Sequence, residues 1–275
     1  MNTKYAVHPQ DFKSYDTSRI REEFLLDSLM VEGKVVLNYT HYDRFIVGGI
    51  VATTPLTLPN PSDLRADYFL ERRELGIINV GQAGTITVDG EKHQLNHKEC
   101  LYVGRGNKVV SFESNDASIP AKFYLCSSPA HTSYPIAHYT LEDAEPMTVG
   151  SLEQSNERTI YKFIHEKGIQ SCQLVMGMTM FSAGSIWNTM PAHVHNRRME
   201  AYFYFDMNES ARVMHFMGEP SETRHIVVKN DEAIVSPPWS LHSGAGTSSY
   251  SFIWAMAGEN LDYTDMDIVS MDQLK

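Results

Sequence analysis

The sequence predicts an all-β protein made of two similar β-sandwiches in tandem, with one helical segment near its start. Short apolar or alternating runs rich in Val, Ile, Phe and Tyr recur along most of the chain and are separated by turn residues, which is the pattern of strands. Strands and helices do not alternate, which argues against a nucleotide-binding α/β fold. A weak internal repeat of the strand pattern indicates two such units.

The helical segment covers residues 10–30, where Ile20, Phe24, Leu25 and Leu29 recur at roughly helical spacing among charged neighbours. The strands expected after it fall into two groups. The first group comprises residues 34–39, 45–52, 76–80, 84–88, 100–103 and 108–112. The second group comprises residues 173–181, 201–205, 212–216, 225–228, 232–235 and 249–257. Along the first of these, Met176, Met178 and Met180 alternate and are expected to fill a core face.

The internal repeat relates these two groups. When Arg72-Arg73 is placed over Arg197-Arg198, residues 76–80 fall on residues 201–205, and further on residues 99–103 fall on residues 232–236. The second unit carries extra residues in between, which fit a hairpin around residues 217–223. We expect His215 and His225, on the two arms of this hairpin, to lie at the surface. We therefore expect an N-terminal domain of residues 1–140 and a C-terminal domain of residues 141–275, joined near residues 129–155.

Composition excludes several classes of function. The 275 residues include 23 Lys and Arg against 34 Asp and Glu, a formal net charge of −11, and no basic stripe stands out, so we expect no nucleic-acid partner. No apolar run is long enough to span a membrane, and the first residues lack a signal-peptide core. Three cysteines without CxxC spacing favour a reduced compartment. We expect a soluble, cytoplasmic protein with no membrane partner.

The second unit contains a pattern typical of a metal site. A His-x-His pair alone means little, because twelve histidines in 275 residues produce about 0.5 such pairs by chance. On a strand, however, His193 and His195 project from the same face, so both imidazoles can reach one ion. A turn follows, and we expect Glu200 to open a hairpin partner strand that brings its carboxylate to the same ion.

His242, which follows the turn at Pro237-Pro238, is the expected fourth ligand. Three imidazoles and one carboxylate suit zinc, and also iron, manganese or nickel, with positions left for water or substrate. The alternative is a surface strand whose histidines are solvated. At the corresponding positions the first unit has Tyr68, Leu70, Leu75 and Val109. We therefore expect one metal ion per chain, in the second unit.

The pattern HxHx4E followed by a late His after a Pro turn resembles the cupin superfamily, which implies two tandem cupin-type jelly-roll barrels. The whole chain is similar to the family of 4-deoxy-L-threo-5-hexosulose-uronate (5-keto-4-deoxyuronate) ketol-isomerases. Five motifs carry this resemblance: YTHYDR (39–44), FLERRELG (69–76), RTIYK (158–162), MPAHVH (190–195) and WSLHSG (239–244).

The resemblance implies a zinc ion held by His193, His195, Glu200 and His242. It also implies a homohexamer that acts in pectin breakdown, converting its uronate substrate to 3-deoxy-D-glycero-2,5-hexodiulosonate. Such a reaction moves a proton between adjacent carbons through an enediol(ate), so it needs positive charge at the developing oxyanion and a group that carries the proton.

The sequence does not identify that proton carrier. Candidates by location are Tyr202, Tyr204, Lys162 and His165, each of which has a structural role as its alternative. For the substrate carboxylate, Arg is the natural partner because its planar fork binds carboxylates through two hydrogen bonds. Arg158, Arg197 and Arg198 are the candidates, although at least one of the latter two is expected in a solvated turn. Trp187, Met190 and Trp239 flank the site and are candidates for its walls, although we expect core packing for Met190.

Two other functional classes remain open at this point. A cupin dioxygenase uses the same ligands to hold iron, copper or manganese, and it would consume oxygen. A non-catalytic sugar-binding cupin would bind its ligand without turnover, even after metal removal. The complete set of four ligands argues against a sugar-binding cupin, and the end-to-end resemblance argues against a dioxygenase.

Overall fold

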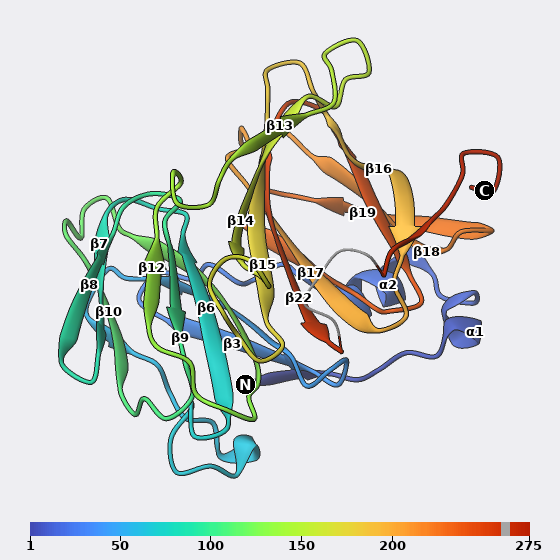
Figure 1. The fold of residues 1–275 in the computed structure, drawn as a ribbon. Coiled ribbons are helices and arrows are strands. Elements are labelled where there is room, and N and C mark those ends of the chain that lie inside the picture. Colours follow the sequence, from blue (N-terminus) through green and yellow to red (C-terminus); the bar gives the residue numbers. More distant parts are fainter. Residues whose placement is uncertain (260–264) are drawn as a thin grey trace.

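Two β-barrels lie side by side in the computed structural model, which describes residues 1–259 and 265–275 (Figure 1). The predicted all-β fold of two tandem cupin-type jelly-roll barrels with a short helical N-terminal segment is thus confirmed. In the described part of the chain, none of the helices is both long and apolar enough to cross a membrane.

The first barrel pairs a seven-stranded sheet with a four-stranded sheet. In spatial order the larger sheet contains β1 (Asn2–Lys4), β3 (Val35–Thr40), β4 (Ile46–Val51), β11 (Lys122–Pro129), β6 (Arg73–Asn79), β9 (Cys100–Val103) and β12 (Ala137–Tyr139). The smaller sheet contains β5 (Leu56–Thr57), β10 (Val110–Ser114), β7 (Gly84–Val88) and β8 (Glu91–Leu95), and a 3-10 turn η1 (Ser62–Leu64) lies in the loop before β6. Alternate residues such as Leu75 and Ile77 fill the space between these sheets.

The second barrel repeats this plan with a seven-stranded and a five-stranded sheet. The larger sheet contains β13 (Met147–Val149), β14 (Arg158–Ile164), β15 (Val175–Phe181), β22 (Ser251–Gly258), β17 (Arg198–Phe205), β20 (Glu232–Ser236) and β2 (Leu25–Leu26). The smaller sheet contains β19 (Glu222–Val228), β18 (Val213–Glu219), β21 (Leu241–Gly246), β16 (Trp187–Val194) and β23 (Asp267–Ile268).

The helical segment is shorter than residues 10–30. It contains α1 (Pro9–Phe12) and α2 (Thr17–Phe24), and the Asp16 side chain caps α2 by accepting a hydrogen bond from the backbone N–H of Arg19. The helix ends at Phe24 because Leu25 and Leu26 pair with β20. Both helices pack against strands of the second barrel, beside which they lie in Figure 1. The start of the chain therefore completes the second barrel, and the domain boundary at residues 140 and 141 stays a prediction.

The outer faces of the two seven-stranded sheets pack against each other. Tyr124 of β11 stacks on Phe203 of β17 with ring centroids 4.5 Å apart. Met176 and Met178 of β15 are fully buried in the same cluster, which confirms the expected core face of that strand. Gly76 permits the close approach, because a Cβ added there would lie 2.8–2.9 Å from side-chain atoms of Ile164, Leu174 and Met176.

A buried carboxylate joins the barrels at this interface. Glu74 of β6 is inaccessible to solvent and accepts hydrogen bonds from the backbone N–H groups of residues 172, 173 and 174 at 2.7–2.8 Å. The hydroxyl groups of Tyr102 and Ser128 donate two more. Three consecutive backbone donors form a concave anion-binding nest. The first barrel therefore supplies the carboxylate, and the second barrel supplies the backbone N–H donors that bind it.

We predict that Glu74→Gln destabilises the protein by about 2–4 kcal/mol, because the amide NH2 group would face backbone N–H donors in a buried site. Glu71→Gln is the matched control, since the Glu71 carboxylate accepts one exposed backbone hydrogen bond, from Asp67. Urea unfolding of both variants measures the difference. Equal stability of the two variants would contradict the role assigned to Glu74.

Candidate metal centre

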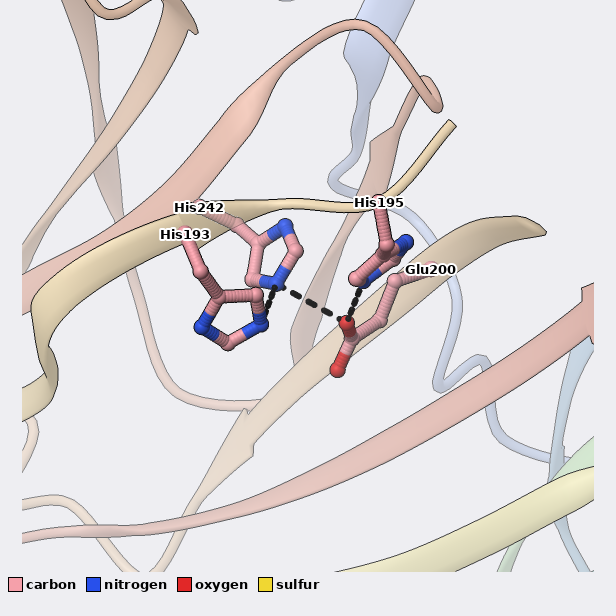
Figure 2. Close-up of side chains that lie close together, drawn as sticks. All are labelled: His193, His195, Glu200 and His242. Atoms are coloured by element: carbon pink, nitrogen blue, oxygen red, sulfur yellow. Dashed lines mark hydrogen bonds and ion pairs between the residues drawn. The ribbon is translucent and has the colours of Figure 1, made fainter. Parts of the chain in front are cut away.

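Four side chains meet inside the second barrel. His193 lies near the end of β16, His195 directly follows that strand, Glu200 lies on β17 and His242 on β21. One potential ligand atom from each lies within 4.8 Å of the others. Figure 2 shows the three imidazole rings and the carboxylate turned toward one another. The four residues singled out from the sequence are thus brought together.

The strands bring these residues together differently from the expected hairpin. His193 and His242 are direct partners in the ladder between β16 and β21. Glu200 pairs instead with Ser236 and Met256 in the seven-stranded sheet. The turn after His195 therefore carries the chain from one sheet to the facing one, and the donors converge across the barrel interior rather than along one hairpin.

Short contacts orient the atoms that could bind a metal ion. Nε2 of His242 lies 3.0 Å from Nε2 of His193 and 2.9 Å from Oε2 of Glu200, which also lies 3.0 Å from Nε2 of His195. On its other side, Nδ1 of His195 lies 2.9 Å from the backbone oxygen of Arg198. A proton on Nδ1 donates to that carbonyl and leaves the Nε2 lone pair facing the cluster, as in histidine ligands of metal ions.

Burial and the neighbouring charges together set the protonation of the cluster. Glu200, His195 and His242 are buried, and His193 is half-buried. Desolvation and the neighbouring His242 lower the pKa of His193 to about 3. Desolvation acts to raise the pKa of Glu200, but the imidazoles of His242 and His195 outweigh it and hold that pKa well below its usual range. Neutral imidazole and ionised carboxylate are the forms that bind metal ions.

The donor set fits a divalent transition metal. Three imidazole nitrogens and one carboxylate oxygen suit zinc, iron, manganese or nickel and leave coordination positions open. Within the described residues this is the one such group of three or more His, Cys, Asp or Glu side chains. At the corresponding positions of the first barrel, Leu70 and Leu75 are core residues and Val109 is exposed.

A cavity of about 350 Å³ adjoins the cluster. His193 and Glu200 line it together with three residues proposed from the sequence, Arg158, Lys162 and Tyr202. Arg158 and Lys162 lie on the same face of β14, four residues apart. The Tyr202 hydroxyl lies 3.1 Å from Oγ1 of Thr189. Met190, for which core packing was expected, also lines the cavity.

Other sequence candidates lie elsewhere. His165 lines a neighbouring hollow of about 270 Å³, and Trp187 stacks on Phe216 outside the cavity. Trp239 donates to the backbone oxygen of Val7. The expectation that both tryptophans wall the site is therefore wrong, because each packs on the outside of the smaller sheet or against the N-terminal segment. Tyr204 is fully buried and does not line the cavity.

The histidine that partners Tyr204 was misjudged from the sequence. His215 was expected at the surface, but it is fully buried, with Nδ1 2.7 Å from the Tyr204 hydroxyl. Its predicted hairpin, β18 with β19, is present. The extra residues between the aligned halves indicated the hairpin, but not which of its faces the barrel would cover.

The two adjacent arginines differ in exposure, as expected. Arg197 is exposed and pairs with Glu259 at 2.9 Å, whereas Arg198 is buried, lines the cavity and pairs with Asp265 at 2.7 Å. Because both have carboxylate partners within the chain, Arg158 is the better candidate for a substrate carboxylate. Nη1 of Arg158 donates a hydrogen bond to the backbone oxygen of Asn156.

Sequence reasoning missed one wall of the cavity. Phe252, Trp254 and Met256 of β22 line it, and their alternation along the strand was the available signal. A Cβ added at Gly177 on the neighbouring strand β15 would lie 2.2 Å from the Trp254 ring. The absence of a side chain at Gly177 therefore makes room for the indole.

Comparison with known proteins agrees with this architecture. Over its whole length the chain is 55% identical to a protein of Shouchella clausii named 4-deoxy-L-threo-5-hexosulose-uronate ketol-isomerase, covering 100% of both chains. A protein of the same name from Formosa agariphila is 55% identical, with 99% of this chain and 98% of that one covered. The fold matches the crystal structure of an IolB-like protein from Salmonella typhimurium with a TM-score of 0.70, at 14% identity and 90% and 96% coverage.

A family model described as KduI/IolB matches residues 25–271. This range includes the four donor residues and the cavity residues of both sheets. The family resemblance inferred from the sequence motifs is confirmed. The chain belongs to the KduI/IolB family.

Proposed function

We propose that this protein is a metal-dependent ketol-isomerase that converts 4-deoxy-L-threo-5-hexosulose uronate to 3-deoxy-D-glycero-2,5-hexodiulosonate. The observation that carries the proposal is the 55% identity, without a missing block, to ketol-isomerases named for that substrate. The cluster of His193, His195, Glu200 and His242 beside a cavity supports it, because a ketol isomerisation needs positive charge where the enediolate oxygen develops.

In this proposal those four residues hold one Zn²⁺ ion per chain. When bound, the ion acts as a Lewis acid that stabilises negative charge on the substrate oxygens. The buried Arg198 backbone oxygen keeps His195 in the ligating tautomer. The apolar side chains of Phe252, Trp254 and Met256 exclude water from one side of the cavity and strengthen electrostatic interactions within it.

Tyr202 is positioned to donate a hydrogen bond to the substrate. Its ring centroid lies 5.3 Å from that of His242. Burial raises the pKa of Tyr202 well above its usual range, so the hydroxyl keeps its proton. Such a group stabilises a developing oxyanion by donation and does not act as a base. We propose this role for Tyr202. Lys162 supplies a positively charged side chain at the cavity wall.

Arg158 is our candidate for binding the substrate carboxylate. A guanidinium group forms two parallel hydrogen bonds with a carboxylate. The hydrogen bond from Nη1 of Arg158 to a backbone oxygen orients the side chain but does not neutralise it. Arg158 thus offers a positive charge at the cavity while Arg198 is held by Asp265.

The first prediction concerns the metal. Purified protein should isomerise the substrate, lose this activity on chelation and regain it with zinc. His242→Gln should lower both metal content and turnover, the latter by more than about 100-fold, because it removes a ligand. His225→Gln, at an exposed position on β19, is the control and should retain both. Metal content and turnover are measured on the same samples.

The outcomes separate the competing functions. Stoichiometric metal and oxygen consumption without isomerisation would favour a dioxygenase. Sugar-acid binding that survives metal removal without turnover would favour a binding protein. Full activity in metal-free protein would contradict the proposed role of the four donors.

The second prediction concerns the substrate carboxylate. Arg158→Gln should lower kcat/KM by about 10- to 100-fold, mainly through KM, since a hydrogen bond to a charged group contributes about 1.5–3 kcal/mol. Arg158→Lys should restore part of the loss. Arg212→Gln is the matched control, because Nη1 of Arg212 also donates to backbone oxygens but lies outside the cavity. An unchanged KM in Arg158→Gln would exclude this role.

The assembly and location of the protein remain proposals. The resemblance implies a homohexamer, and the open edges of the sheets are compatible with association between copies. Sedimentation of the purified protein tests this assembly. A cytoplasmic location is the setting we propose for such a metabolic enzyme.

A further inference from the structure

A second and larger cavity lies at one end of the first barrel. Its volume is about 670 Å³. Its walls come from the N-terminal segment, the turn between β3 and β4, the loop that contains η1, and the ends of β6 and β11. None of its lining residues belongs to the cavity beside the metal cluster. The proposed isomerase chemistry therefore does not account for it.

Positive charge gathers in this cavity. Arg44, Arg72 and Arg73 line it together with His41, and Asp63 is the one carboxylate among its described lining residues. Within the described part of the chain, none of the three guanidinium groups forms an ion pair. In a protein with a formal net charge of −11, three adjacent arginines without carboxylate partners favour an anionic ligand.

Backbone carbonyl groups hold two of these arginines in place. Nη2 of Arg73 donates to the backbone oxygens of Arg44 and Ser127, and Nε donates to the Ser127 hydroxyl. Nη2 of Arg72 donates to the backbone oxygens of Leu64 and Arg65. These bonds orient the guanidinium groups without neutralising them. The cation site is therefore ordered before a ligand arrives, which lowers the entropic cost of binding.

The third arginine lies in a strained turn. Asp43 and Arg44 have φ angles of 49° and 53°, in the left-handed region that favours glycine. Hairpin turns with two such residues normally carry Asn or Asp followed by Gly. Arg at the second position therefore keeps a strained backbone conformation. Strain of this kind is typical of ligand-binding segments.

Aromatic rings form another part of the cavity wall. The Tyr5 ring stacks on His41 with centroids 4.8 Å apart and an interplanar angle of 10°, and Tyr39 meets His41 edge-on at 5.2 Å. Tyr5 is nevertheless 70% exposed. An exposed, stacked tyrosine beside arginines suits a ligand that has both an anionic group and a flat or ring-shaped body.

We propose that this cavity is a second ligand site, which binds a small organic anion through its carboxylate or phosphate group. The guanidinium groups of Arg44, Arg72 and Arg73 bind the anionic group, and Tyr5 and Tyr39 contact the body of the ligand. A sugar acid and a sugar phosphate share this chemistry, so the test includes both.

The test is calorimetric titration of the intact protein with galacturonate, glucose 6-phosphate, inorganic phosphate and uncharged glucose. Arg72→Gln removes one cation. Arg44→Gly removes another and relieves the left-handed strain, so its fold should be at least as stable as the original. Arg105→Gln is the matched control, because Arg105 also donates to backbone oxygens, those of Ala130 and His131, but does not line the cavity.

We expect saturable binding of at least one organic anion, weakened by salt and absent for glucose. Its affinity should fall at least about tenfold in Arg72→Gln and Arg44→Gly and stay unchanged in Arg105→Gln. Comparing the two sugar anions with inorganic phosphate identifies which anionic group is bound.

Three results would overturn the proposal. The first is the absence of saturable binding at anion concentrations up to about 10 mM, beyond which affinity is negligible. The second is equal binding by all variants. The third is loss of self-association in Arg72→Gln without any anion binding, which would make this surface a contact between copies of the chain.

Discussion

The distance between the two sheets of the second barrel is the constraint on which the candidate metal centre depends. Facing sheets pack about 10 Å apart, so inward side chains from both sheets meet midway. His193 and His242 come from one sheet and Glu200 from the other, and their donor atoms lie within 4.8 Å together with that of His195. In the first barrel, leucines at the corresponding positions complete an apolar core. The same architecture thus forms either a packed core or a cation site, and a few inward residues decide which.

Strand β17 connects this site to the rest of the molecule. Glu200, Tyr202 and Tyr204 point into the second barrel, while the alternate residues Met199, Ala201 and Phe203 face the first barrel. The backbone N–H of Met199 donates to Oδ2 of Asp43 at 3.0 Å, across the interface. The Glu74 carboxylate of the first barrel also joins the barrels, because it accepts hydrogen bonds from backbone N–H groups of the second. The first barrel therefore supports the strand that carries Glu200, although its own interior holds no such cluster in the described residues.

Local patterns predicted what depends on local geometry. The i, i+2 spacing of His193 and His195 is a property of one strand, and alternation in β15 correctly predicted the buried methionines. The sheet to which β17 belongs depends on pairing with β20 and β22, so the expected hairpin with β16 was wrong. Likewise, α2 ends early because Leu25 and Leu26 pair with a strand more than 200 residues away. Trp254 was missed because its place depends on the missing side chain of Gly177, on a neighbouring strand.

The central claim is that these four side chains hold one metal ion between the sheets. The most direct test is an anomalous difference map from a crystal of the purified protein, recorded at the absorption edge of the metal found in it. Our account predicts one peak per chain, bound by nitrogen atoms of His193, His195 and His242 and by the Glu200 carboxylate, with at least one coordination position left open. A fully loaded protein whose peak lies away from these residues, or whose ion has no open position, would contradict it.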